Sequence, residues 1–269
     1  MASVRPAAIA GMFYPGKPDE LARNVDAMLA AATPATAVSV PKAIIAPHAG
    51  FIYSGPVAAS IYVLLAPARA RIKRVVLLGP THRVAIHGMA LPGVDAFATP
   101  LGNIAIDAGS VKKLMTLPFV GASAEAHRLE HSLEVHLPFL QKVIDEFTLL
   151  PLAVGRATAQ QVAAVLDLLW GGNETLIVIS SDMSHYLPYA DAQATDRATA
   201  QAILNLRTDI NHHQACGATP VIGLNLLAQQ RGLKPQLIDL RNSGDTAGDK
   251  ARVVGYGSFA FYEQPSLTH

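Results

Sequence analysis

The chain has 269 residues, of which 51% are hydrophobic and 15% charged, and its formal net charge is +1. This composition predicts a folded protein with a sizeable core and excludes an intrinsically disordered chain. The balanced charge argues against nucleic acid and against an anionic membrane surface as partners. We therefore expect one domain over residues 1–269, with its core at about 11–262.

One cysteine, Cys216, excludes an internal disulfide and a cysteine-rich zinc site. The first residues, "MASVRPAAIAGMFYPG", lack the apolar core of a signal peptide. No stretch approaches the roughly 18 to 20 apolar residues that a membrane span requires. Together these features predict a cytoplasmic protein.

In chain order, short apolar runs alternate with longer Ala- and Leu-rich segments at helical spacing. We expect strands at residues 42–48, 73–80, 88–92, 148–155, 174–182, 235–241 and 253–262. We expect helices at residues 18–32, 55–68, 133–144, 158–171, 190–206 and 218–232. Several strands are apolar at successive positions, which is typical of strands covered on both faces. The alternation predicts an α/β fold, a single domain with a central mostly parallel or mixed sheet flanked by helices.

Local signals mark the ends of several of these elements. Residues 98–107, "ATPLGNIAID", predict an antiparallel hairpin, which would make the sheet mixed. Pro56 stands near the start of a predicted helix, where a missing N–H costs little. Gly232 follows another helix and is expected to cap its carboxyl end.

Polar side chains follow four of the predicted strands. His48 follows "AIIAP", His82 follows "RVVLLGPT", Asp182 and His185 follow "TLIVIS", and residues 241–245 follow "QLIDL". In open α/β sheets, ligands bind beyond the carboxyl ends of the strands. If the strands are parallel, these groups converge on one edge of the sheet, where we expect a functional cleft.

Imidazoles gathered with a carboxylate are typical of metal sites. Two imidazoles plus one carboxylate leave coordination positions open and suit non-haem Fe(II) oxygen chemistry. Neutral imidazole also suits zinc, whose bound water would give hydrolysis instead. The residues themselves do not choose between these metals.

The segment "LEHSLEVHLPFLQ" at residues 129–141 carries further polar groups. His131 and His136 are five residues apart, so they do not match the His-Glu-x-x-His zinc helix. We expect an amphipathic helix capped by Ser132, with Glu134 near its positive end. Glu130 and His131, just ahead of that helix, are candidate site residues.

Other histidines and the cysteine are expected to be structural. His212 and His213 precede Cys216 in "NHHQACGATP". We interpret this stretch as a surface loop and a small buried thiol leading into a helix, rather than as a nucleophile or a metal site. His127 is expected in a loop without convergent partners.

Seven motifs stand in order along the chain: "GMFYPG", "APHAGFIYSG", "LLGPTHR", "EHSLEVHLPFLQ", "SSDMSHY", "CGATP" and "NSGDTAGD…VVGYGS". Together they resemble the Memo family, also called the AmmeMemoRadiSam system protein B family, from about Gly11 to Tyr262. The resemblance implies a fold like that of class III extradiol ring-cleaving dioxygenases, with an active-site cleft at the strand ends. It also implies that microbial members work with a radical-SAM protein, although this chain has no iron–sulfur cysteine motif.

The resemblance also assigns residues of the cleft. His48 and His82 match the family's two metal-binding histidines. His131 and His185 match further histidines of the cleft, and Asp182 is their neighbour, so the resemblance makes these three the expected catalytic residues.

The third metal position is where the chain departs from the family. Some members place a cysteine in that late loop, and the related dioxygenases use a carboxylate, whereas the aligned residue here is Thr246. Asp245 stands next to Thr246, and its carboxylate binds a divalent metal more strongly than the threonine hydroxyl does. We therefore expect Asp245 to be the third ligand.

The leading hypothesis is a metal-dependent oxidoreductase of the dioxygenase type. His48, His82 and Asp245 would hold the metal, expected to be Fe(II), with Zn or Cu as alternatives. His131 or His185 would act as acid or base, because the unperturbed pKa of imidazole, about 6.5, lies close to neutral pH.

Two alternatives stay open. The same cleft, with Arg83 and Arg241 nearby, would hold an anionic peptide or small molecule in a protein without enzymatic activity. Zinc-dependent hydrolysis at the same residues is the other alternative.

Overall fold

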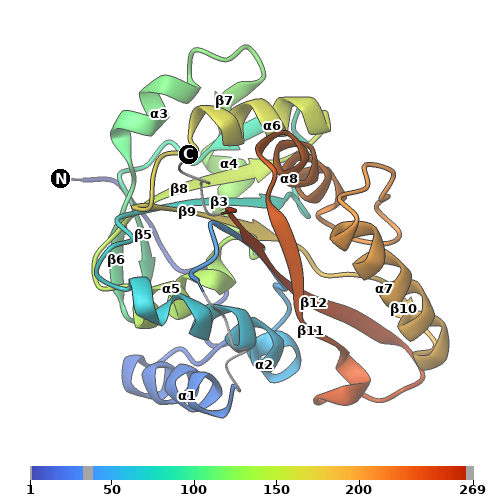
Figure 1. Cartoon of the computed structure of the whole chain (residues 1–269). Helices are drawn as coiled ribbons and strands as arrows, with labels where there is room; N and C mark the ends of the chain where they lie inside the picture. The colour runs from blue at the N-terminus through green and yellow to red at the C-terminus, as the bar shows by residue number, and fades with distance from the viewer. Residues whose placement is uncertain (1, 33–38, 265–269) are drawn as a thin grey trace.

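A nine-stranded sheet forms the centre of the molecule (Figure 1). The computed structural model describes residues 2–32 and 39–264. The strands are β2 (Ala43–Ala46), β3 (Arg74–Pro80), β4 (Met89–Leu91), β7 (Val120–Ala122), β8 (Thr148–Val154), β9 (Thr175–Ser180), β10 (His185–Leu187), β11 (Lys234–Asn242) and β12 (Val253–Tyr262). Their order is β10-β12-β2-β9-β3-β8-β4-β7, and β11 pairs with β12. Each of the seven predicted strands is present, and the predicted α/β fold is confirmed.

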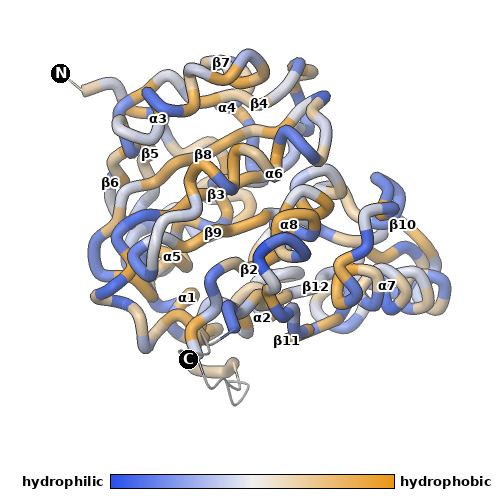
Figure 2. Tube along the Cα trace, turned by 45° about the horizontal axis from the view of Figure 1, so that its top comes forward, coloured by the Kyte–Doolittle hydropathy of each residue, from blue (hydrophilic) through white to orange (hydrophobic). Residues whose placement is uncertain are grey.

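Four neighbouring strands, β2, β9, β3 and β8, run parallel. Their side chains alternate between two cores. In β2, Ile44 and Ala46 join the core on one face, and Ala43 and Ile45 join the core on the other. This two-sided burial explains why the strands are apolar at successive positions. Figure 2 shows hydrophobic residues running along β3, β8 and β9.

Helices cover both faces of the sheet (Figure 1). On one face, α1 (Pro18–Ala31), α2 (Phe51–Tyr62) and α5 (Leu137–Val143) pack against one another. On the other face, α6 (Ala159–Leu168) packs against α8 (Ala218–Arg231), and α7 (Tyr189–Leu204) packs against β11 and β12. The shorter elements are α3 (Ala108–Leu114), α4 (Ala124–Arg128), η1 (Val63–Ala68), η2 (Glu134–His136) and η3 (Ser243–Asp245).

The helix ends follow local chemistry. Gly232 caps α8 in the left-handed conformation, with φ of 68°, as the sequence predicts for a residue without a Cβ. Thr158 and Gln161 form a reciprocal capping box at the start of α6. In contrast, α2 begins at Phe51, before the predicted start, so Pro56 lies inside the helix.

The predicted hairpin at residues 98–107 is present as β5 (Ala96–Thr99) and β6 (Gly102–Ala105). Together with β1 (Val4–Arg5), these strands form a separate three-stranded sheet. The central sheet is therefore mixed for a different reason. Strand β12 runs antiparallel to both β2 and β11, and β4 runs antiparallel to β8.

One helical stretch, Phe51–Ala68, is 18 residues long and apolar enough to cross a membrane by length and composition. This differs from our expectation that no stretch reaches that length. However, 67% of it is buried inside the molecule, where α2 packs against α1, α5 and β2. Its apolar composition is explained by its place in the core.

Candidate metal centre

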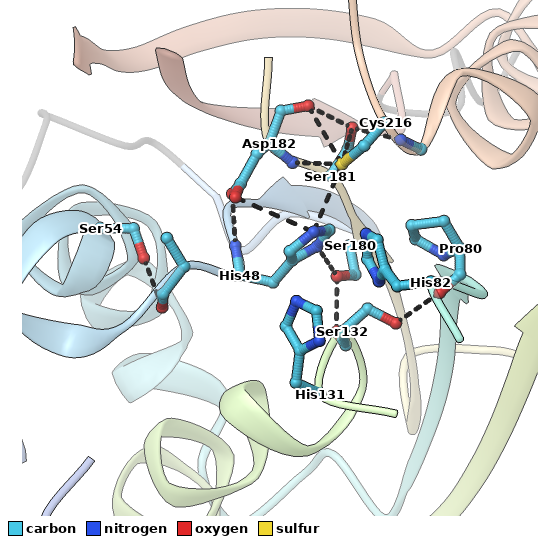
Figure 3. A network of polar contacts seen from close by, with 12 residues as sticks. His48, Ser54, Pro80, His82, His131, Ser132, Ser180, Ser181, Asp182 and Cys216 are labelled. Carbon is cyan, nitrogen blue, oxygen red and sulfur yellow. Dashed lines mark hydrogen bonds and ion pairs between the residues drawn. The ribbon is translucent and has the colours of Figure 1, made fainter. Parts of the chain in front are cut away.

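Three neighbouring strands bring polar residues to one edge of the sheet. His48 follows β2, Asp182 follows β9 and His82 follows β3, and β9 lies between the other two strands. The segments remain close after the strands end, because Ser181 N donates to Ala46 O at 3.0 Å. The predicted convergence of these three side chains is present (Figure 3).

The rings of His48, His82 and His131 point toward one another (Figure 3). Their ring centroids lie 4.5 Å apart for His82 and His131, 5.2 Å for His48 and His82, and 5.5 Å for His48 and His131. The His82 and His131 rings stack, and His48 meets both edge-on. Within residues 2–32 and 39–264, these three form the group whose ligand atoms, all within 4.8 Å of one another, could hold a metal ion.

Hydrogen bonds to the Nδ1 atoms orient the His48 and His82 rings, and a longer ion-pair contact reaches His131. His48 Nδ1 lies 2.6 Å from Ser180 Oγ, and His82 Nδ1 lies 2.8 Å from Glu130 Oε1. His131 Nδ1 lies 3.4 Å from the same Glu130 oxygen. A histidine engaged at Nδ1 presents Nε2 as its ligand atom, so His48 and His82 offer Nε2 to a metal.

The environment keeps two of these imidazoles neutral. Burial and the neighbouring histidines hold the pKa of His48 well below its usual value. Burial, followed by the charge of His82, lowers the pKa of His131 to about 4. Neutral imidazole is the form that binds metals, so these side chains are ready to do so at neutral pH.

Two buried carboxylates border the histidines and differ in charge. Burial raises the pKa of Asp182 to about 7, although the backbone N–H of His48 donates to its Oδ1 at 2.7 Å. Burial also opposes ionisation of Glu130, but hydrogen bonds and charge from His82, together with the Ser132 N–H, outweigh it and lower the pKa to about 2. Glu130 is therefore ionised at neutral pH, whereas the carboxyl group of Asp182 gains or loses its proton close to neutral pH.

This donor set fits a divalent metal. A metal with bonds of about 2.1 Å holds its ligands roughly 3.0 to 3.5 Å apart, so small rotations of the rings complete the site. Imidazole is a ligand for zinc, copper, iron and nickel alike, and three imidazoles do not select among these metals.

Asp245, predicted as the third ligand, lies outside the histidine group. Its carboxylate accepts hydrogen bonds from the Tyr189 hydroxyl and from Asn242 N. The reason is strand order, because β12 lies between β2 and β11, the strand that Asp245 follows. Two strand spacings of about 4.8 Å separate the two strand ends. His131, predicted as a catalytic residue, is the third member of the histidine group.

Asp182, predicted as a catalytic residue, contacts His48, and His185, also predicted as catalytic, follows Asp182 at the start of β10. His185 Nδ1 contacts Met183 O at 2.8 Å, which requires a proton on Nδ1 and leaves Nε2 as an acceptor. Burial lowers the pKa of His185. Asp182 Oδ2 lies 3.9 Å from His48 Nε2. Each residue carries a group that can exchange a proton, and its catalytic role stays a prediction.

Cys216 also contacts the centre, which our sequence interpretation missed. Its Sγ lies 3.3 Å from His48 Nε2 and accepts a hydrogen bond from Asp182 N at 3.2 Å. Burial, followed by the charge of Asp182, raises the pKa of this thiol to about 12, so it is protonated at neutral pH. The available signal was the motif "CGATP", which belongs to the family pattern, whereas His212 and His213 lie in an exposed loop as predicted.

The segment around Ser132 also differs from the prediction. Ser132 does not cap a helix; its hydroxyl donates to Pro80 O at 2.8 Å, and its carbonyl accepts from Ser180 Oγ at 2.6 Å. The predicted helix is split into η2 and α5. Glu134, fully buried, pairs with Arg5 at 2.6 Å rather than with the helix end.

A model of the family described as "Memo-like protein" matches residues 5–260 of this chain. The chain belongs to the Memo family. A MEMO1 family protein of Aquifex aeolicus is 37% identical, and the match covers 96% of this chain and 99% of the relative. A MEMO1 family protein of Archaeoglobus fulgidus is 35% identical over 94% of this chain and 97% of the relative.

A solved structure shows the same fold. An uncharacterized protein from Escherichia coli K12 superposes with a TM-score of 0.50 and 13% sequence identity. The match covers 82% of this Memo-family chain and 99% of the other. At this level of identity the likeness concerns the fold alone.

Proposed function

We propose that this Memo-family protein is a metal-dependent oxidoreductase of the class III extradiol dioxygenase type, with His48, His82 and His131 as the ligands of Fe(II). The observation that supports this proposal is the convergence of three imidazoles, whose ligand atoms lie within 4.8 Å of one another at the edge of the sheet. A bound Fe(II) ion would supply the oxygen chemistry, and three protein ligands leave coordination positions open for substrate and O₂.

The remaining side chains supply proton transfer. His185 Nε2 is positioned as an acceptor, because Nδ1 is held by Met183 O. It would take the proton of a substrate hydroxyl as that oxygen approaches the metal. Asp182, whose pKa burial raises to about 7, can accept or donate a second proton near neutral pH. The ligand that we propose is accordingly a small molecule with ionisable hydroxyls; a short peptide is the alternative.

Zinc-dependent hydrolysis is the second candidate, and one observation favours it. The third position is taken by His131 rather than by a carboxylate. Three histidines with one open position are typical of catalytic zinc, which lowers the pKa of its bound water to about 7.

Anaerobic purification with elemental analysis, followed by Fe(II) reconstitution and an oxygen-uptake assay with catechols, tests the proposal. Iron at one equivalent with oxygen uptake would support the oxidoreductase. Zinc at one equivalent with ester hydrolysis would support the second candidate. Tight metal binding with neither oxygen uptake nor ester hydrolysis would contradict both proposed activities and would support a binding protein without enzymatic activity. Failure to bind any divalent metal would overturn the site itself.

Two further proposals come from the sequence. A radical-SAM protein is the protein partner that we propose, from the family resemblance, and co-purification from the native host tests it. We propose a cytoplasmic location, because the single cysteine suits a reducing compartment.

A further inference from the structure

Glu130 is a buried carboxylate in contact with two of the three metal-site histidines. It is 2% exposed and directly precedes His131 in the loop after α4. Its Oε2 accepts a hydrogen bond from His82 N at 2.6 Å. Its Oε1 contacts His82 Nδ1 at 2.8 Å, accepts from Ser132 N at 2.9 Å and lies 3.4 Å from His131 Nδ1.

These contacts align the two rings. One carboxylate oxygen reaches both Nδ1 atoms, and the His82 and His131 rings stack with their centroids 4.5 Å apart and their planes at 26°. Two imidazoles that share an Nδ1 partner and lie nearly parallel direct their Nε2 atoms to the same side. A carboxylate acceptor also requires the proton to sit on Nδ1, which leaves Nε2 free as a ligand.

The carboxylate of Glu130 is paired with histidines rather than with a lysine or an arginine. Among residues 2–32 and 39–264, its ion-pair contacts are to His82 and His131 and none is to lysine or arginine. Glu134, four residues further on, is equally buried but pairs with Arg5 at 2.6 Å. A buried carboxylate needs a cation nearby, and a metal held on the far side of the two rings would take the place of the imidazole charge.

We propose that Glu130 is a positioning residue of the metal centre, which fixes the Nδ1–H tautomer of His82, aligns His131, and places a negative charge one imidazole away from the cation. This proposal rests on the proposed function only in that the three histidines hold a divalent metal; it does not depend on the reaction. Outer partners of this kind typically contribute 10- to 100-fold to metal affinity.

The tautomer is tested on the metal-free protein. Glu130→Gln removes the charge and keeps the size, and Glu130→Asp keeps the charge at shorter reach. In the wild type, ¹⁵N NMR of the imidazoles is expected to show His82 protonated at Nδ1. In Glu130→Gln, we expect a mixture of Nδ1–H and Nε2–H forms, with partial recovery in Glu130→Asp. An unchanged His82 tautomer in a folded Glu130→Gln variant would overturn the proposal.

Affinity is tested with Zn²⁺ alone, by competition with a chromophoric chelator. The dissociation constant is expected to rise 10- to 100-fold in Glu130→Gln and less in Glu130→Asp. Glu134→Gln is the matched control, because it neutralises a buried carboxylate of the same segment that contacts no metal-site histidine. At temperatures below its own thermal unfolding midpoint, the Glu134→Gln variant should bind Zn²⁺ with the same dissociation constant as the wild type.

Equal losses in Glu130→Gln and Glu134→Gln would show a general structural effect and overturn the proposal. So would a wild type that binds no Zn²⁺. A wild type that binds Zn²⁺ tightly but shows no oxygen uptake with iron would contradict the proposed oxidoreductase and leave the role of Glu130 intact.

Discussion

Each imidazole of the centre has a polar group at its Nδ1 atom: Ser180 for His48, and Glu130 for both His82 and His131. A ring that is already oriented loses little rotational freedom when a metal binds, which raises affinity. The three rings should therefore act as one unit, and loss of any one should affect binding far more than loss of a nearby acidic side chain.

We predict that His131→Ala weakens Zn²⁺ binding by more than about 100-fold, beyond the range typical of outer partners. Asp245→Ala should leave the affinity unchanged, because its carboxylate contacts Tyr189 and Asn242 instead. Equilibrium dialysis of the two purified variants provides the comparison. If Asp245→Ala lost the metal and His131→Ala kept it, the assignment of the third position would have to be reversed.

At the scale of elements, one buried ion pair joins the N-terminal segment to the segment that carries the third histidine. Arg5, in β1, donates to Glu134, to His127 O and to Glu130 O. Glu134 also accepts from the backbone of Ala8 and Ile9 and from the Tyr14 hydroxyl at 2.6 Å. Arg5 thus anchors the loop that presents Glu130 and His131 through its backbone carbonyls, and Glu134 anchors the N-terminal residues.

Arg5→Met is expected to lower the free energy of unfolding by about 3–5 kcal/mol, because it leaves the Glu134 carboxylate buried without its cation. Arg69→Met provides the control. It breaks an exposed pair with Asp145, and such pairs contribute about 0–1 kcal/mol. Urea titrations of the metal-free proteins measure both. Similar small losses in the two variants would contradict the anchoring role.

The whole molecule is expected to lose stability in mild acid, because it buries neutral histidines. His127 Nε2 donates to Ala90 O at 2.8 Å, and its buried Nδ1 has no partner among the residues that the structure describes. Burial lowers the pKa of His127 to about 4 and that of His136 to about 3. The unfolded chain, with histidine pKa values near 6.5, binds protons that the native state does not.

Stability should therefore fall as the pH decreases from about 6.5 to about 4, by up to about 1.4 kcal/mol per pH unit for each such histidine. We predict that His127→Gln reduces this slope by about that amount, even if it lowers stability at neutral pH. His87→Gln, at an exposed position, is the control and should leave the slope unchanged. Urea titrations at several pH values measure the slopes, and parallel curves for His127→Gln and the wild type would contradict the prediction.

Much of this fold could be predicted from local sequence patterns. Runs that are apolar at successive positions indicate strands buried on both faces, and parallel strands place their carboxyl ends at one edge. His48, His82 and Asp182 follow three such runs, so their meeting could be predicted from the sequence alone. The helices followed from apolar periodicity, although the start of α2 and the 3₁₀ turn of η2 that leads into α5 did not.

Which residue joins His48 and His82 as the third member of the group, and which residues surround it, depended on tertiary structure. Asp245 follows a strand as His48 does, but β12 is inserted between the two strands, and no local pattern encodes that order. His131 and Glu130 come from a loop whose place is set by contacts with Arg5, far away in sequence. Local chemistry decides which segments become strands and which residues end them. Pairing between distant segments decides which of those ends meet, because strand order and loop anchoring depend on contacts that no short stretch contains.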